Sequence, residues 1–374
     1  MNKFDDIRPY NADEIPAAIQ RMADSDVIPA IAAYLMPGMP AEALRERIRS
    51  IRTLDEMQLG LLKEVMEIML KKTTTKLSWS GVENIHEKKP YLFVSNHRDI
   101  VLDAMILQYI LNEAGQKTCQ ITFGSNLMSH PFVVDFGKAN KMFRTERGGT
   151  PREFYQSLMH LSEYMRYVIT EVHESVWIAQ RNGRTKNGID ATDPAIIKMF
   201  DMSRHDDSVA SLAELHIVPV AVSYEWESCD KLKALELYLT KKNGRYEKKP
   251  GEDLNSILTG IQQQKGRVHF HLCEPVSEED LKKVDNSLNS NDFYKNVALL
   301  MDKRINGNFH LWPNNYIAHD LRSGTDTYAQ HYTEEQKSTF VKYMDWMNEY
   351  PDMDRKELEA IFLGIYANPV DNSF

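Results

Sequence analysis

The sequence contains, between residues 91 and 103, the stretch Tyr91-Leu92-Phe93-Val94-Ser95-Asn96-His97-Arg98-Asp99-Ile100-Val101-Leu102-Asp103. Its first four residues predict a β-strand, and a helix is expected from about Ile100 onward. In open α/β sheets, ligands bind where the carboxyl ends of the strands meet the following turns. The polar turn after Val94 is therefore the place where functional side chains are expected.

Further strands are predicted by four short apolar runs, at residues 120–123, 175–178, 217–222 and 267–272. Helical stretches lie between them, and the clearest opens with the capping box Thr150-Pro151-Arg152-Glu153. Strands that alternate with helices indicate the α/β class. We therefore expect a mostly parallel or mixed sheet flanked by helices.

The two ends of the chain are expected to be helical additions to this sheet. Capping boxes at residues 53–56 and 333–336 precede apolar side chains at helical spacing. We expect an N-terminal helical subdomain (1–75), an α/β domain (76–325) and a C-terminal helical extension (326–374). The polar segment 241–253 is expected to be an exposed loop.

Composition restricts the class of protein. The chain has 374 residues, of which 42% are hydrophobic and 26% charged, as in globular proteins. Its net charge of −9 argues against nucleic acid as a partner. The three cysteines, Cys119, Cys229 and Cys273, form no metal or disulfide pattern, which suits a reducing cytoplasm.

Membrane-spanning and secreted classes are not expected. The acidic start of the chain lacks the apolar region of a signal peptide. No run reaches the roughly 18–20 apolar residues that a spanning helix needs. Any membrane contact is therefore expected to be peripheral.

His97 is the candidate general base in the turn. A carboxylate beside it would fix the imidazole and stabilise the imidazolium that forms on proton transfer. Asp99 and Asp103 are both candidates for this partner. The alternative is a structural histidine near a solvated helix residue. On this segment alone, the two interpretations have about equal weight.

Two short motifs also suggest a protein kinase, namely His97-Arg98-Asp99 and Asp135-Phe136-Gly137. Ala104 stands where a kinase has its metal-binding asparagine, five residues after the first Asp. No glycine-rich loop precedes these motifs, and no Ala-Pro-Glu follows them. The kinase interpretation is therefore set aside.

Four blocks in order resemble the glycerolipid acyltransferase superfamily, which includes glycerol-3-phosphate and lysophosphatidic acid acyltransferases. They are Ser95-Asn96-His97-Arg98 with Asp103, followed by residues 141–148, 177–186 and 217–225. The resemblance implies a sheet flanked by helices and direct acyl transfer to a hydroxyl, with His97 as base. It implies acyl-CoA or acyl carrier protein as co-substrate, with no cofactor and no metal.

The resemblance also implies a set of substrate-binding residues and a place of action. The residues are Asn96, Arg98, Phe143, Arg144, Arg147, Gln180, Gly183, Arg184, Lys186 and Pro219. The arginines and the lysine suit a phosphate or another anionic head group. The expected partners are lipids of the membrane surface, with the protein cytoplasmic and peripherally bound to the inner face.

Two departures from the family pattern matter. Five residues separate His97 from Asp103 where the family has four, and one extra helical residue rotates a side chain by about 100°. Asp103 is favoured over Asp99 because an apolar helix continues from it as in the family. Gln180 stands at an acidic position, keeping hydrogen bonds but losing charge.

The change at Gln180 leaves the acceptor open. It is a glycerol phosphate, a lysophospholipid or another lysolipid such as an amino-acid lipid. The alternative from a different class is a lipid-binding member of the fold without catalytic activity, against which the presence of His97 with a nearby Asp argues.

Overall fold

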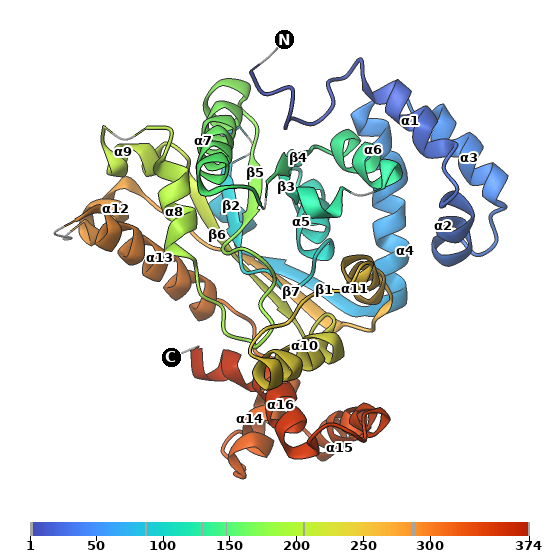
Figure 1. Ribbon diagram of the computed structural model, residues 1–374, viewed down its shortest axis with the longest axis vertical. Helices are drawn as coiled ribbons and strands as arrows, with labels where there is room; N and C mark the ends of the chain where they lie inside the picture. The colour runs from blue at the N-terminus through green and yellow to red at the C-terminus, as the bar shows by residue number, and fades with distance from the viewer. Residues whose placement is uncertain are drawn as a thin grey trace.

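A mixed sheet of seven strands forms the centre of the molecule (Figure 1). The computed structural model describes residues 3–86, 88–128, 130–146, 148–204, 206–285 and 289–372. In spatial order, the strands are β1 (Thr74–Ser80), β7 (Gly266–Leu272), β6 (Ile217–Tyr224), β2 (Leu92–Ser95), β5 (Val176–Ala179), β3 (Gln120–Gly124) and β4 (Met142–Thr145). All neighbours are parallel except β6 and β7. The predicted α/β class with a mixed sheet is confirmed.

The five strands expected from the sequence are present, with their ends displaced by at most two residues. Two strands were not expected, β1 and β4, and these are the two edges of the sheet. Edge strands have only one neighbour and carry more polar residues. The sequence of β1, Thr-Thr-Lys-Leu-Ser-Trp-Ser, accordingly lacks a continuous apolar run.

Helices cover both faces of the sheet, and the alternation of side chains along β2 divides the core between them. Phe93 points into one core, whereas Leu92 and Val94 point into the other. The first core is covered by α1 (Ile15–Ala23), α2 (Ile28–Leu35), α3 (Ala41–Ser50), the π-helical η1 (Glu56–Leu62), α4 (Lys63–Thr73), α5 (Leu102–Glu113) and α6 (Pro131–Ala139).

The second core lies under helices from the middle and the later part of the chain. They are α7 (Pro151–Tyr167), the π-helical η4 (Val168–Val172), α8 (Pro194–Asp201), α9 (Ser208–Ala213), α12 (Glu278–Val284) and α13 (Ser290–Gly307). Short 3-10 turns complete the chain at η2 (Val82–Asn84), η3 (Ser125–Leu127), η5 (Ala329–His331) and η6 (Met344–Glu349).

The C-terminal helices form a third apolar cluster at the lower end of Figure 1. It contains α10 (Asp230–Asn243), α14 (Pro313–Ser323), α15 (Glu334–Tyr343) and α16 (Arg355–Asn372). The loop expected at 241–253 is shorter than predicted, because α10 continues to Asn243 and α11 (Glu252–Gln262) follows. Among the described helices, none combines the length and apolar character needed to cross a bilayer.

The capping boxes that the sequence suggested determine where helices begin. Thr150 accepts from the backbone N–H of Glu153, whose carboxylate accepts from the N–H of Thr150. The same exchange occurs at Thr333, before α15. It also occurs at Thr53, where the helix that follows has a π-helical turn.

Candidate active site

Three parallel strands bring the candidate residues to one edge of the sheet. β2 lies between β5 and β6, and Ser95 is in register with Ala179 of β5 and Val220 of β6. The turns after β2 and β5 and the last residue of β6, Tyr224, therefore meet at the carboxyl edge. His97 stands two residues beyond the end of β2.

His97 is hydrogen bonded to Asp103 at the beginning of α5. The distance from its Nδ1 atom to the Oδ2 atom of Asp103 is 2.9 Å. A carboxylate oxygen accepts, so Nδ1 carries the proton and Nε2 is the nitrogen that can take another. The edge of the ring stands against Trp177, with the ring centres 5.8 Å apart, and 8% of the residue is exposed.

Four hydrogen bonds fix the carboxylate of Asp103, which has no exposed surface. Its Oδ2 atom also accepts from the backbone N–H groups of Arg98, at 2.7 Å, and Asp99, at 3.0 Å. Its Oδ1 atom accepts from the hydroxyl of Tyr224, at 2.8 Å. The turn that contains the additional residue therefore wraps around Asp103 and presents it to His97.

Asp99 has a different position, at the amino end of α5. Its Oδ1 atom accepts from the N–H groups of Val101 and Leu102, at 2.9 and 2.8 Å, and so caps the helix. Its Oδ2 atom accepts from the Ser228 hydroxyl. Of the two carboxylates that the sequence left open, only Asp103 is bonded to the imidazole among the described contacts.

Asn96 and Arg98 belong to the buried scaffold of the turn. The Asn96 amide bonds the backbone N–H and the carbonyl of Val222, at 2.7 and 3.0 Å, which ties the turn to β6. The Arg98 guanidinium is 1% exposed and pairs with Asp190 and Glu227. Both side chains are buried, so neither faces solvent.

A buried polar network continues from Arg98 to the C-terminal helices. Lys233 donates to the Arg98 carbonyl at 2.8 Å and to Glu227 at 2.6 Å. The Tyr366 hydroxyl, on α16, accepts from the N–H of Glu227 and donates to Asp230 at 2.6 Å. Burial raises the pKa of Asp230, and burial with this neighbouring charge raises the pKa of Tyr366 well above its ordinary value. The C-terminal extension thereby supports the turn.

The segment after β5 passes directly beside His97. The N–H of Thr185 donates to the His97 carbonyl at 2.7 Å, which places Arg184 next to the turn. The Nη1 atom of Arg184 is buried and has no hydrogen-bond partner among the described residues. Gly183 adopts a left-handed conformation, with φ of +78°, which a side chain would disfavour.

Other predicted residues of this segment are engaged by the protein. Lys186 forms an ion pair with Glu236 of α10. Gln180 has no exposed surface, and its Oε1 atom accepts from the Thr192 hydroxyl at 3.3 Å. Its Nε2 atom is without a partner among the described residues. Pro219 lies within β6, paired with Val94, beneath the turn rather than at it.

Phe143 and Arg144, two of the residues predicted from the second block, lie away from His97. They belong to β4, three strands from β2, and strand spacing of about 4.8 Å makes that roughly 14 Å. Phe143 is buried against Tyr164, with ring centres 5.0 Å apart. Arg144 is half-exposed and paired with Glu146 at 2.6 Å. Arg147 lies outside the described residues.

Sequence reasoning gave no role to several residues that hold the site. Tyr224 is the last residue of β6, so its position at a carboxyl strand end was a usable signal. Asp190, Glu227 and Lys233 hold the Arg98 turn from segments about a hundred residues away. No spacing pattern in the sequence connects them to His97.

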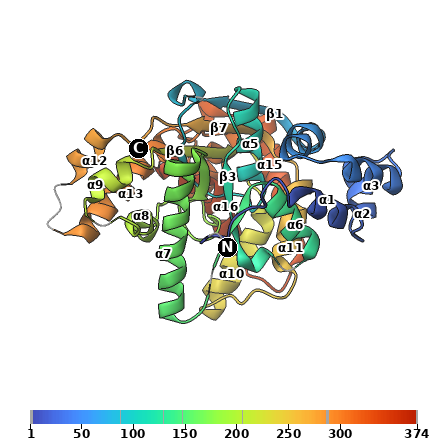
Figure 2. The ribbon, with the colours of Figure 1, turned by 90° about the horizontal axis from the view of Figure 1, so that it is seen from above.

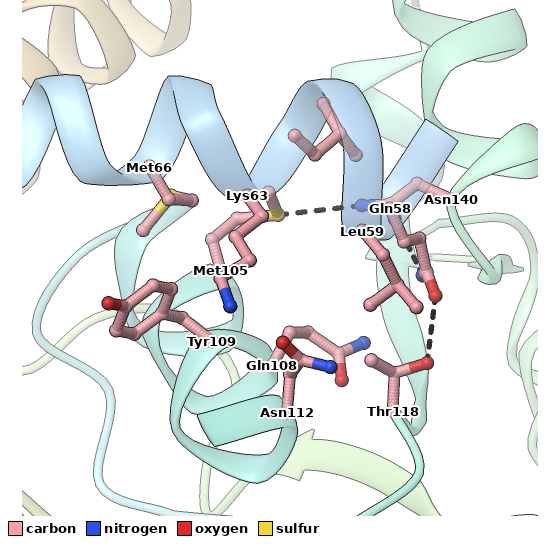
Figure 3. A pocket seen from close by; sticks show the side chains of 11 residues that line it. Gln58, Leu59, Lys63, Met66, Met105, Gln108, Tyr109, Asn112, Thr118 and Asn140 are labelled. Atoms are coloured by element: carbon pink, nitrogen blue, oxygen red, sulfur yellow. Dashed lines mark hydrogen bonds between the residues drawn. The ribbon is translucent and has the colours of Figure 1, made fainter. Parts of the chain in front are cut away.

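A small cavity beside α5 is separate from the site (Figure 3). Its volume is about 30 Å³, room for little more than a water molecule. Met105 and Tyr109 line it, whereas Gln58 closes one end by bonding Thr118 and Asn140. Met105 is two helical residues from Asp103, about 200° around the axis, so the cavity faces away from the catalytic candidates.

A known family matches the part of the chain that contains the candidate site. Residues 76–223 match the family model described as Acyltransferase, and this segment contains the His97 turn, β2, β5 and most of β6. This match supports general acyl-group transferase activity for the domain within residues 76–223.

Among solved structures, the chain has a distant likeness to an acyltransferase. The 1-acyl-sn-glycerophosphate (LPA) acyltransferase PlsC from Thermotoga maritima matches with 11% sequence identity and a TM-score of 0.39. The match covers 77% of this chain and 91% of that protein. The search of curated proteins found no match.

Proposed function

We propose that the protein transfers a fatty acyl group from acyl-CoA or acyl carrier protein to the hydroxyl of a glycerol phosphate or lysophospholipid. The observation that carries this proposal is the His97–Asp103 hydrogen bond of 2.9 Å at the carboxyl edge of the sheet. It supports a base whose free nitrogen is directed by a fixed carboxylate.

In the proposed reaction, Nε2 of His97 takes the proton of the acceptor hydroxyl as its oxygen attacks the thioester carbonyl. The tetrahedral intermediate then expels the thiolate, which receives the proton from the imidazolium. Asp103 stabilises the imidazolium between these steps because its carboxylate is already oriented by Tyr224 and two backbone N–H groups. The products are an ester and a free thiol, and no covalent acyl-enzyme is required.

Arg184 is the side chain that we assign to the anionic group of the substrate. It lies beside the His97 turn, and the unpartnered Nη1 atom leaves part of its guanidinium fork available for an oxyanion. Lys186 and Arg144 are less suited because Glu236 and Glu146 neutralise them.

The proposed substrates place the protein at the inner face of a membrane, as a peripheral protein in the cytoplasm. A second acceptor, a lysolipid with an amino-acid head group, remains in the proposal because Gln180 contributes no charge near Arg184.

The test measures thiol release from acyl-CoA and from acyl carrier protein, with glycerol 3-phosphate, lysophosphatidic acid and an amino-acid lysolipid as acceptors. His97→Ala is expected to lower the rate by about 10²–10⁴-fold, the usual contribution of a general base. Product analysis by mass spectrometry must show the new ester. Equal slow release by the wild type and His97→Ala would refute acyl transfer by this site.

A further inference from the structure

A group of exposed apolar side chains surrounds the edge of the sheet where His97 lies. On α11, Leu254 and Leu258 are 57% and 47% exposed and stand four residues apart, on one face of the helix. At the beginning of α7, Phe154 and Tyr155 are 38% and 56% exposed. Large apolar side chains presented together on a surface mark a site of interaction.

The topology places α7 and α11 on the same edge as the site. α7 begins at Pro151, six residues after the end of β4, whose carboxyl end lies on the edge of β3 and β5. α11 ends just before β7, which begins beside the carboxyl end of β6. Figure 2 shows α7, α10 and the segment after α10 extending toward the lower side of that view.

Direct contacts connect α11 to the His97 turn. A Cβ atom on Gly260 would lie 2.1 Å from Oδ2 of Asp99, so the helix packs closely on the turn. At its other end, Asp253 accepts from Asn126, which follows β3, at 3.0 Å. Burial raises the pKa of Asp253, but Lys248, Asn126 and the charge of Arg184 together lower it. α11 therefore borders the proposed anion-binding residue.

The segment beside these leucines is basic within an acidic protein. Residues 241–251 contain five lysines and arginines and one glutamate, a net charge of +4 in a chain of net charge −9. Lys242 and Lys249 are exposed and have no ion-pair partner within the described part of the chain. Basic and apolar side chains on one surface are the combination that binds bilayers with anionic lipids.

We propose that α11, the basic segment 241–251 and the beginning of α7 form the surface by which this protein binds an anionic lipid bilayer. The inference rests on the proposed function, since it supplies a lipid substrate to the same edge of the sheet. Leu254, Leu258 and Tyr155 enter the interface, and Lys242 and Lys249 contact the lipid head groups. The edge of the sheet that carries His97 and Arg184 then faces the membrane.

The test is cosedimentation with phosphatidylcholine vesicles, with and without about 30% phosphatidylglycerol. The double variant Leu254→Asp/Leu258→Asp is expected to lose at least tenfold in vesicle affinity. The matched control is Leu299→Asp on α13, which alters a leucine that is 64% exposed on another part of the protein. Its vesicle affinity should stay within twofold of that of the wild type. Thermal unfolding establishes that all variants are folded.

A charge variant, Lys242→Glu/Lys249→Glu, tests the head-group contacts. It should remove the preference for anionic vesicles and leave the weaker binding to neutral ones. Equal vesicle affinity in the wild type and the leucine variant would overturn the proposal. The proposal would also be overturned if the variants kept vesicle binding but lost affinity for acyl carrier protein. The surface would then bind an acidic protein.

These measurements are independent of acyl transfer. If the wild type binds vesicles through α11 but releases no thiol with any acceptor, the proposed function fails and the membrane surface stands. If thiol release depends on His97 but the leucine variant binds vesicles normally, the proposed membrane surface is wrong and the proposed function stands.

Discussion

Two regions of the sheet contain histidines in opposite settings. His97 follows the parallel strand β2 and is bonded to the carboxylate of Asp103. His269 lies within the antiparallel strand β7, where its ring nitrogens face the hydroxyls of Ser78 and Ser80, at 2.9 and 3.1 Å. Its ring centre is 5.2 Å from that of His310.

The difference shows what makes a histidine suitable as a base. Burial, with His310 and His271 nearby, lowers the pKa of His269 to about 4, so this imidazole resists a proton. No carboxylate is bonded to it among the described contacts. His97 has a carboxylate that compensates the charge acquired on proton transfer. The bonded carboxylate and the position at the end of a strand, rather than the residue type, distinguish the two sites.

The largest expected effect comes from removing the partner of each histidine. Asp103→Asn should lower kcat by about a thousandfold, because an amide cannot stabilise the imidazolium and can select the wrong tautomer. Ser78→Ala/Ser80→Ala, the equivalent change at His269, should leave kcat within twofold. Steady-state kinetics on both variants, with circular dichroism to establish folding, make the comparison.

Asp99, the other carboxylate near His97, supplies a further control. Asp99→Ala should cost about 1–2 kcal/mol of unfolding free energy, through the lost helix cap, and less than tenfold in kcat. Equal and mild kinetic losses in Asp99→Ala and Asp103→Asn would contradict the assignment of Asp103.

The same contrast explains how far the sequence could be interpreted. The strand, turn and helix around His97 are adjacent in the chain, so local patterns predicted them and located the base. The choice between Asp99 and Asp103 needed the path of the turn, which depends on backbone N–H groups that enclose one carboxylate. Periodicity gives no information about such a turn.

Local sequence patterns could not predict contacts between residues that come together only when the chain folds. Arg98 was expected to bind substrate, and it instead pairs with Asp190 and Glu227 in the interior. Those partners stand 92 and 129 positions away. The strands β1 and β4 were also missed because, as edges, they lack the apolar runs of central strands.

A smaller effect is expected at Tyr224, which supports Asp103 from β6. Tyr224→Phe leaves the Oδ1 atom of Asp103 buried without its donor, which should cost about 1.5–3 kcal/mol of stability. We expect kcat to fall by about tenfold with KM unchanged, since the carboxylate becomes less firmly oriented. Kinetics and denaturant unfolding on one preparation measure both quantities.

A matched variant separates stability from positioning. Tyr294 donates to the buried carboxylate of Asp201 at 2.7 Å, in the core on the other face of the sheet. Tyr294→Phe should therefore lose similar stability without a change in kcat. If it lowers kcat as much as Tyr224→Phe does, the effect at Tyr224 is general destabilisation.

The smallest expected effect on activity belongs to the β7 histidine, whose contribution is to stability. The pKa of His269 is about 4 when folded, below its ordinary value near 6.5. Between these values, the unfolded chain binds a proton that the folded protein does not, so stability falls as pH falls from about 6.5 to 4. Above pH 6.5 the ring is neutral in both states, so it does not make the stability depend on pH.

His269→Gln should therefore reduce the drop in melting temperature between pH 7 and about pH 4.5, while kcat at pH 7 stays within twofold of wild type. The same substitution at the exposed His86 is the control for a change of side chain alone. If the melting temperature of His269→Gln falls with pH as much as that of the wild type, other groups cause the loss of stability in acid. A large loss of kcat would show that the two histidine regions are coupled, contrary to the division drawn between them.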